Sequence, residues 1–118
     1  MTIKNDEEIL EELRSATSGR LYMSESDYPF ELVNWDSQTE VTPEFLRQQT
    51  NEASDAAINE SDPHSFLGGR FQNVLEILKT NLSELKVYKV GRINMPVYVV
   101  GRSAQGTWLG LSTRVVET

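Results

Sequence analysis

The residues best suited to chemistry form a short polar loop, Ser24-Glu25-Ser26-Asp27. This loop offers hydroxyls and carboxylates between the apolar residues 21–23 and an aromatic, β-branched stretch that reads as a strand ending near Trp35. Tyr28-Pro29 restricts the backbone where the chain leaves the loop, because the residue before a proline is disfavoured in the helical region of φ/ψ space. The sequence therefore predicts an acidic loop held between two buried segments, and an ordinary solvated turn is the alternative interpretation.

A second oxygen-rich feature is the end of the sequence, Glu117-Thr118. An exposed terminal threonine combines a carboxylate with a hydroxyl, and Mg²⁺ prefers such hard oxygen donors. Every chain ends in a carboxylate, so this feature alone does not indicate a function.

Other catalytic arrangements have little support in the sequence. The only histidine, His64, lies beside Asp62 and Pro63 in a stretch that we expect to be an exposed loop, so several imidazoles cannot share a metal. Gly68-Gly69 lacks the lysine and the spacing of a phosphate-binding loop and predicts a bend before a helix. With 18 acidic residues some carboxylates will always lie close together, which makes paired carboxylates a weak signal. We therefore expect that the protein is not an enzyme. A small hydrolase that uses carboxylates or His64 is the remaining hypothesis, and the single histidine counts against it.

The composition limits the partners and the compartment. The net charge is -7, so the average field repels phosphate backbones, and we expect no direct nucleic-acid binding, whereas a basic protein is attracted. No cysteine is present, which excludes disulfides and thiolate ligands and fits a reducing compartment. No apolar run is long enough to span a membrane and no signal peptide is visible, so a cytoplasmic protein without a membrane partner is expected.

The elements that must position these residues follow from periodicity. Residues 5–17 have a capping residue, an acidic first turn and apolar residues at helical spacing, and the helix is expected to end at Ser18-Gly19. Thr42 and Pro43 predict the start of a short helix that ends near Thr50. Residues 51–65 are polar and read as an irregular surface segment.

The second half of the chain predicts a helix and a sheet. Six apolar residues share one helical face, namely Leu67, Phe71, Val74, Leu75, Leu78 and Leu82. Three β-rich runs follow at 85–91, 95–102 and 107–116, and their short connections require antiparallel neighbours. Both faces of the last run carry large apolar groups. We therefore expect one α+β domain over residues 1–118, a three-layer α/β/α sandwich with a largely antiparallel central sheet.

Several segments together are typical of one protein family. They are the acidic first helix, residues 21–31 with the Met-Ser-Glu-Ser loop, Gln48-Gln49-Thr50, the helix core from Phe71 to Leu82, Val97-Tyr98-Val99-Val100-Gly101, and the last residues Ser112 to Thr118. In these segments the chain resembles the nuclease A inhibitor family, small acidic proteins that block a sugar-non-specific endonuclease acting on DNA and RNA. The resemblance spans nearly the whole chain and implies an α/β/α sandwich fold.

The resemblance implies a mechanism and a set of contacts. In the family, a loop glutamate matching Glu25 and a terminal threonine matching Thr118 enter the nuclease cleft, and the threonine hydroxyl binds the catalytic divalent metal. The implied partner is a non-specific endonuclease of the ββα-metal type. No intrinsic cofactor is implied, and Mg²⁺ would bridge the two proteins only in the complex. Candidates for surrounding contacts are Ser24, Ser26, Asp27 and, if its side chain points outward, Glu31.

One departure leaves an alternative open. The family's founding type carries a longer and more aromatic segment where this chain has the short, polar residues 51–69. If that segment contributes to the interface, inhibition of the same nuclease is weakened or lost. The alternative hypothesis is an inhibitor-like scaffold that binds a different protein.

Overall fold

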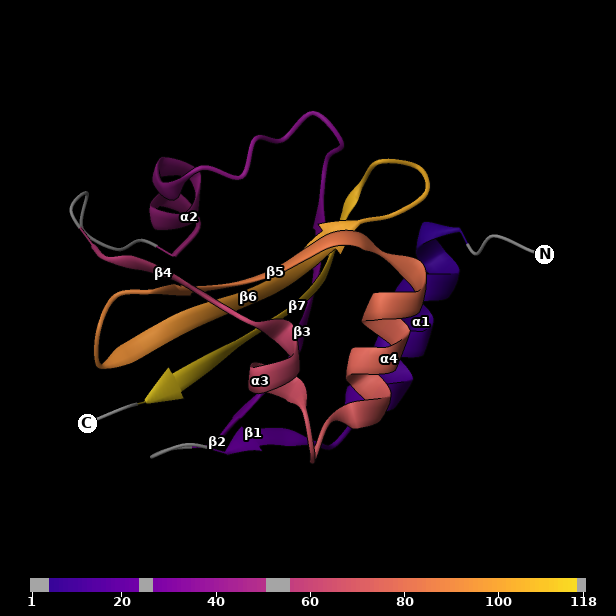
Figure 1. Cartoon of the computed structure of the whole chain (residues 1–118), viewed down its shortest axis with the longest axis horizontal. Coiled ribbons are helices and arrows are strands. Elements are labelled where there is room, and N and C mark those ends of the chain that lie inside the picture. The colour runs from indigo at the N-terminus through magenta and orange to yellow at the C-terminus, as the bar shows by residue number, and fades with distance from the viewer. Residues whose placement is uncertain (1–4, 24–26, 51–55, 117–118) are drawn as a thin grey trace.

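The computed structural model describes residues 5–23, 27–50 and 56–116. Figure 1 shows their helices and strands around one long, twisted sheet. In chain order the elements are α1 (Asp6–Thr17), β1 (Leu21–Met23), β2 (Asp27–Pro29), β3 (Glu31–Trp35), α2 (Pro43–Thr50), β4 (Ile58–Ser61), α3 (Pro63–Leu67), α4 (Gln72–Asn81), β5 (Ser83–Val90), β6 (Asn94–Arg102) and β7 (Trp108–Val116).

The main sheet is antiparallel, as the short connections between its last three strands predicted. Its five strands lie in the order β3-β7-β6-β5-β4, and β7 lies between β3 and β6. The short strands β1 and β2 form a separate two-stranded sheet. The expected strand up to Trp35 is thus divided at Phe30, with β2 pairing to β1 and β3 joining the main sheet.

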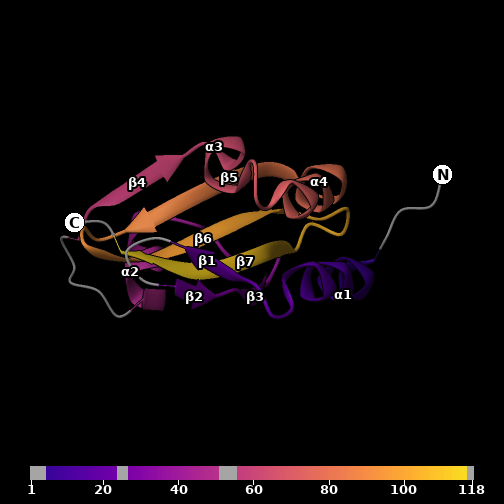
Figure 2. The same ribbon diagram turned by 90° about the horizontal axis from the view of Figure 1, so that it is seen from below.

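Helices cover both faces of the main sheet, which confirms the α+β prediction. On one face, apolar residues of α1, α3 and α4 pack against alternate residues of β6 and β7 in a single buried cluster. On the other face, Leu46 of α2 packs with Val33, Val100 and the ring of Trp108 in a second cluster. Figure 1 shows α2 on the side of the sheet opposite α3 and α4, and Figure 2 shows the same elements turned by 90°.

The helix starts follow from local capping chemistry. Asn5 accepts a hydrogen bond from the Glu8 main-chain nitrogen at 2.9 Å, and the Glu8 carboxylate accepts one from the Asn5 nitrogen at 3.3 Å. This reciprocal capping box begins α1, where the sequence predicted a capping residue and an acidic first turn. The Thr42 hydroxyl accepts a hydrogen bond from the Phe45 nitrogen at 3.1 Å, and α2 extends from Pro43 to Thr50, as expected.

The helix predicted from its six-residue apolar face is divided in two. All six side chains are buried in the same core cluster. Leu67 belongs to α3, however, and α4 extends only from Gln72 to Asn81. Gly69 adopts φ = 80° between the two helices, a conformation that glycine reaches without the steric penalty of a Cβ. The bend predicted at Gly68-Gly69 is therefore confirmed.

The prediction of an irregular segment over residues 51–65 was wrong for its described part. Ile58–Ser61 forms β4 at the edge of the sheet, paired with β5 from Ser61↔Val87 to Ile58↔Val90. Backbone hydrogen bonds hold an edge strand, so it needs few apolar side chains. Asp62 then caps α3, accepting a hydrogen bond from the Ser65 nitrogen at 3.0 Å. Residues 51–55 lie outside the described residues.

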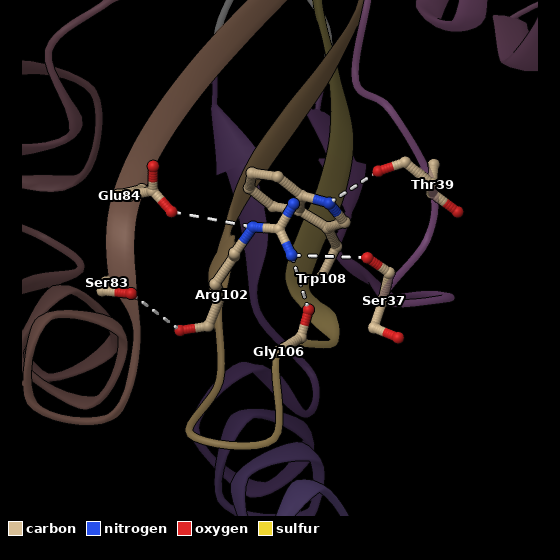
Figure 3. Close-up of polar contacts among 7 residues, drawn as sticks. All are labelled: Ser37, Thr39, Ser83, Glu84, Arg102, Gly106 and Trp108. Carbon is tan, nitrogen blue, oxygen red and sulfur yellow. Dashed lines mark hydrogen bonds and ion pairs between the residues drawn. The ribbon is translucent and has the colours of Figure 1, made fainter.

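A cluster around Arg102 closes the end of the sheet near the β6–β7 turn (Figure 3). The Arg102 guanidinium lies over the Trp108 ring, 4.4 Å from its centroid, and donates to the Gly106 carbonyl at 3.0 Å. The Trp108 ring nitrogen donates to the Thr39 carbonyl at 3.0 Å. On the opposite side, Glu84 approaches the Arg102 Nε atom at 3.6 Å. The cluster thus connects the segment that follows β3 to the sheet.

Candidate functional site

The β1–β2 hairpin contains the residues on either side of the predicted acidic loop. Leu21 pairs with Pro29 at the base of the hairpin, and Met23 pairs with Asp27 at its far end. Strand pairing on both sides fixes the positions at which a connecting loop begins and ends. The flanks are strands, but the expectation that both are buried was wrong. Leu21 is exposed and Tyr22 is half-buried on one side, and among the described residues on the other side only Val33 is fully buried.

Aromatic stacking anchors this hairpin to the helical layer. The Tyr22 ring lies 4.3 Å from the Phe66 ring, centroid to centroid, with 9° between their planes, and it contacts Phe71 at 5.7 Å. The Tyr22 hydroxyl donates to the Phe66 carbonyl at 3.0 Å. Phe30 meets Tyr22 edge-on at 6.1 Å. Because several rings converge on Tyr22, the hairpin is held against the α3–α4 junction.

The hairpin lies beside the last part of β7. The Thr113 hydroxyl donates to the Pro29 carbonyl at 3.0 Å. Glu31 pairs with Ser112 in an antiparallel register, so the chain from Glu31 back to Asp27 follows β7 towards Val116. Figure 1 shows the far end of the hairpin and the end of β7 on the same side of the molecule. We call this side, marked by Met23, Asp27 and Val116, the hairpin end.

Most of the predicted contact residues lie outside the described part of the chain. This applies to Ser24, Glu25, Ser26 and Thr118. Asp27 is the first residue of β2, and its side chain is not described. Whether these residues form one contact surface thus stays a prediction. Glu31, the remaining candidate, is exposed at the start of β3.

A groove of about 310 Å³ lies between the hairpin, the sheet and the last turn of α2. We call it the tyrosine groove, because two tyrosines from β2 and β6 line it. Its lining residues are Tyr28, Pro29, Glu31, Gln49, Thr50, Pro96, Tyr98, Ser112, Thr113 and Arg114. Apart from Glu31, the sequence did not single out these residues as a site, since five separate elements contribute them.

The centre of the groove is a row across three strands. Glu31 and Tyr98 both pair with Ser112, one from each side, so the three side chains point to the same face of the sheet. Burial raises the pKa of the Tyr98 hydroxyl above its usual value, Arg114 lowers it and Glu31 raises it. Both charges therefore lie close enough to the ring to influence its ionisation.

The described residues offer no obvious catalytic centre. His64 is exposed, as predicted, although it lies in α3 rather than in a loop. Within residues 5–23, 27–50 and 56–116, no three histidine, aspartate or glutamate side chains lie together as metal ligands would. The same part of the chain contains no helix long and apolar enough to cross a membrane.

Comparison with known proteins identifies the family. The family model of nuclease A inhibitor-like proteins matches residues 7–69 and 67–118. A search of curated proteins gave no significant match. Because the two matched segments together span nearly the whole sequence, the chain belongs to the nuclease A inhibitor-like family. Membership implies a general role as a nuclease inhibitor, and a nuclease as the partner.

Proposed function

We propose that this protein inhibits a sugar-non-specific, metal-dependent endonuclease of the ββα-metal type, and that its hairpin end enters the active-site cleft. Family membership over residues 7–118 is the observation that carries the proposal. The binding residues we propose are Glu25 and Thr118, with Ser24, Ser26, Asp27 and Glu31 around them. The protein itself catalyses no reaction and acts in the cytoplasm.

Electrostatics gives this mode of inhibition a physical basis. A nuclease cleft that binds a polyphosphate is positively charged, and this protein carries a net charge of -7. Opposite charges accelerate the encounter and orient the two proteins, and added salt weakens the effect. A fixed carboxylate from Glu25 would occupy a substrate phosphate position without offering a bond that the nuclease can cleave.

The arrangement of the strands supports a joint role for the loop and the last residue. The flanks Met23 and Asp27 and the end of β7 at Val116 lie on the same side of the molecule. The segments that extend from these points are the ones that we propose to enter one cleft. The metal in this proposal belongs to the nuclease, and Thr118 would supply a hydroxyl ligand to it.

The test of the function is an inhibition titration. Untagged protein is added to a purified ββα-metal endonuclease with Mg²⁺, and DNA and RNA degradation are followed at low and moderate salt. Stoichiometric inhibition that weakens with salt is the expected result. Undiminished cleavage of both substrates in excess inhibitor at every salt concentration would refute the proposed function for this nuclease class.

The proposed contacts are tested with variants in the same assay. We expect Glu25→Ala, or a short extension after Thr118, to weaken inhibition by roughly tenfold or more, since each removes a charged or metal-directed contact. Glu7→Ala is the control, because Glu7 is exposed on α1 and also removes one negative charge. Equal inhibition by Glu25→Ala, the extended protein and the control would exclude the contacts while leaving the function intact.

The polar segment at residues 51–69 favours one alternative function. The segment is shorter and less aromatic than we expect for the founding type of the family, and it supplies β4 and α3 at the edge of the sheet. A protein with this scaffold and a changed edge would bind a different protein. A specific captured partner, together with absent nuclease inhibition, would support this alternative.

A further inference from the structure

The tyrosine groove combines a carboxylate with aromatic surfaces. Glu31 is exposed on one side of Ser112, and the half-buried Tyr98 lies on the other side. Tyr28, also half-buried, lines the groove from β2. A carboxylate beside aromatic rings is the arrangement that attracts a guanidinium or ammonium group, through an ion pair and through cation–π contact.

Small residues of β7 and the end of α2 leave room for this groove. On the groove face, β7 presents Gly110 and Ser112 between the larger side chains of Trp108 and Arg114. Leu46 of α2 covers the neighbouring part of the sheet, next to Val33 and Val100. Helix α2 ends at Thr50, which together with Gln49 forms the rim of the groove.

The guanidinium of Arg114, at the rim of the tyrosine groove, points away from Glu31. The Arg114 Nη1 atom donates to the Asn94 Oδ1 atom at 3.0 Å. Asn94 belongs to β6, whereas Glu31 belongs to β3, on the other side of β7. The Arg114 side chain therefore leans across the sheet towards β6. It does not neutralise the Glu31 carboxylate by direct pairing in this arrangement.

We propose that the tyrosine groove binds an arginine or lysine side chain from the rim of the nuclease cleft, with Glu31 as its ion-pair partner. This inference rests on the proposed function. The groove adjoins the hairpin end, because Tyr28 follows Asp27 directly and Arg114 lies two residues before Val116. A cleft that binds nucleic acid is surrounded by basic side chains, and arginine is enriched at the centres of protein interfaces. The Glu31 carboxylate, which Arg114 does not pair with directly, thus complements this partner.

The inference is tested by reversing the charge of Glu31. Glu31→Lys and Glu31→Gln are compared with Glu76→Lys in the inhibition titration. Glu76 is exposed in α4, on the face of the sheet opposite the groove, so Glu76→Lys changes the net charge equally without touching the groove. Thermal unfolding of each variant confirms that it is folded before inhibition is compared.

The expected pattern is graded. We predict that Glu31→Lys raises the inhibition constant by about tenfold or more, that Glu31→Gln raises it by about threefold to tenfold, and that Glu76→Lys changes it by less than about threefold. Inhibition by the wild type together with equal constants for Glu31→Lys and Glu76→Lys would overturn the groove inference alone. Absence of inhibition by the wild type would overturn the proposed function and this inference with it.

Discussion

The two ends of the main sheet are built differently. At the end near the β6–β7 turn, Arg102 is held by the Trp108 ring, by two carbonyls and by Glu84 (Figure 3). At the hairpin end, aromatic rings anchor the base of the hairpin, while Glu31 is exposed beside a groove. The first end uses its charged side chain to join segments of the chain. The hairpin end keeps a charged side chain available for another molecule.

This difference separates stability from binding. A cation that is stacked on a ring and hydrogen-bonded to carbonyls lowers the free energy of the folded chain. An exposed carboxylate such as Glu31 adds little to stability, and its charge interacts with whatever docks nearby. A variant of the Arg102 cluster should therefore lower stability without weakening binding, whereas a variant of Glu31 should weaken binding with little loss of stability.

The largest effect on stability is expected for Tyr22→Ala. Removing a ring that stacks on Phe66 and Phe71 should lower the free energy of unfolding by about 3 kcal/mol. The hairpin loses its anchor, so we also expect inhibition to weaken by roughly tenfold. Chemical denaturation and the inhibition titration measure the two effects. Tyr22→Phe is the control, because it keeps the stacked ring and removes the hydroxyl that donates to the Phe66 carbonyl, which should cost about 1 kcal/mol.

A smaller loss of stability is expected for Arg102→Ala at the opposite end. Loss of the stacking on Trp108 and of the bond to Gly106 should lower the free energy of unfolding by about 2 kcal/mol. The inhibition constant should stay within about twofold of the wild type. Arg102→Lys keeps the charge but not the planar stacking, so an intermediate stability is expected. A large loss of inhibition by folded Arg102→Ala would remove the separation between the two ends.

The smallest expected effect is on how the stability of the protein declines at alkaline pH. Burial and Glu31 raise the pKa of Tyr98 above its usual 10.0, with Arg114 opposing, and burial and Glu60 raise that of Tyr88. A raised pKa in the folded state means that the unfolded chain ionises first. This stabilising contribution is complete below about pH 10 and is lost as the pH rises further. Denaturation curves should show a shallower alkaline decline for Tyr98→Phe, and an unchanged slope would contradict this assignment.

Local signals in the sequence predicted most of the elements. The capping residue and acidic first turn of α1 and the Thr42-Pro43 start of α2 are each signals that span only a few residues, and large apolar groups on both faces of β7 predicted a sheet covered on both sides. Strand β4 was missed, because only Ile58 among its residues is strongly apolar and its pairing with β5 depends on distant backbone. The apolar periodicity predicted one helix from Leu67 to Leu82, where the structure has two. The pattern did not reveal the break, because α3 and α4 both bury residues at the same helical spacing.

Less of the candidate site than of the fold could be predicted from the sequence. Glu25 and Thr118 entered through resemblance to a family, and Glu31 was the one groove residue that the sequence analysis named as a contact candidate. The groove depends on Glu31, Ser112 and Tyr98 meeting across β3, β7 and β6. Strand register brings such residues together, and no turn in the sequence fixes the register of β3 on β7, because these two strands are far apart along the chain.

Amide hydrogen exchange of the inhibitor, with and without an equimolar ββα-metal endonuclease and Mg²⁺, tests the central claim most directly. The account predicts slower exchange in the complex around Tyr28 to Glu31 and at the end of β7 near Val116. The β6–β7 turn from Ser103 to Gly106 should exchange at the same rate in both states. Protection confined to that turn and the Arg102 cluster would contradict the claim that the hairpin end binds the nuclease.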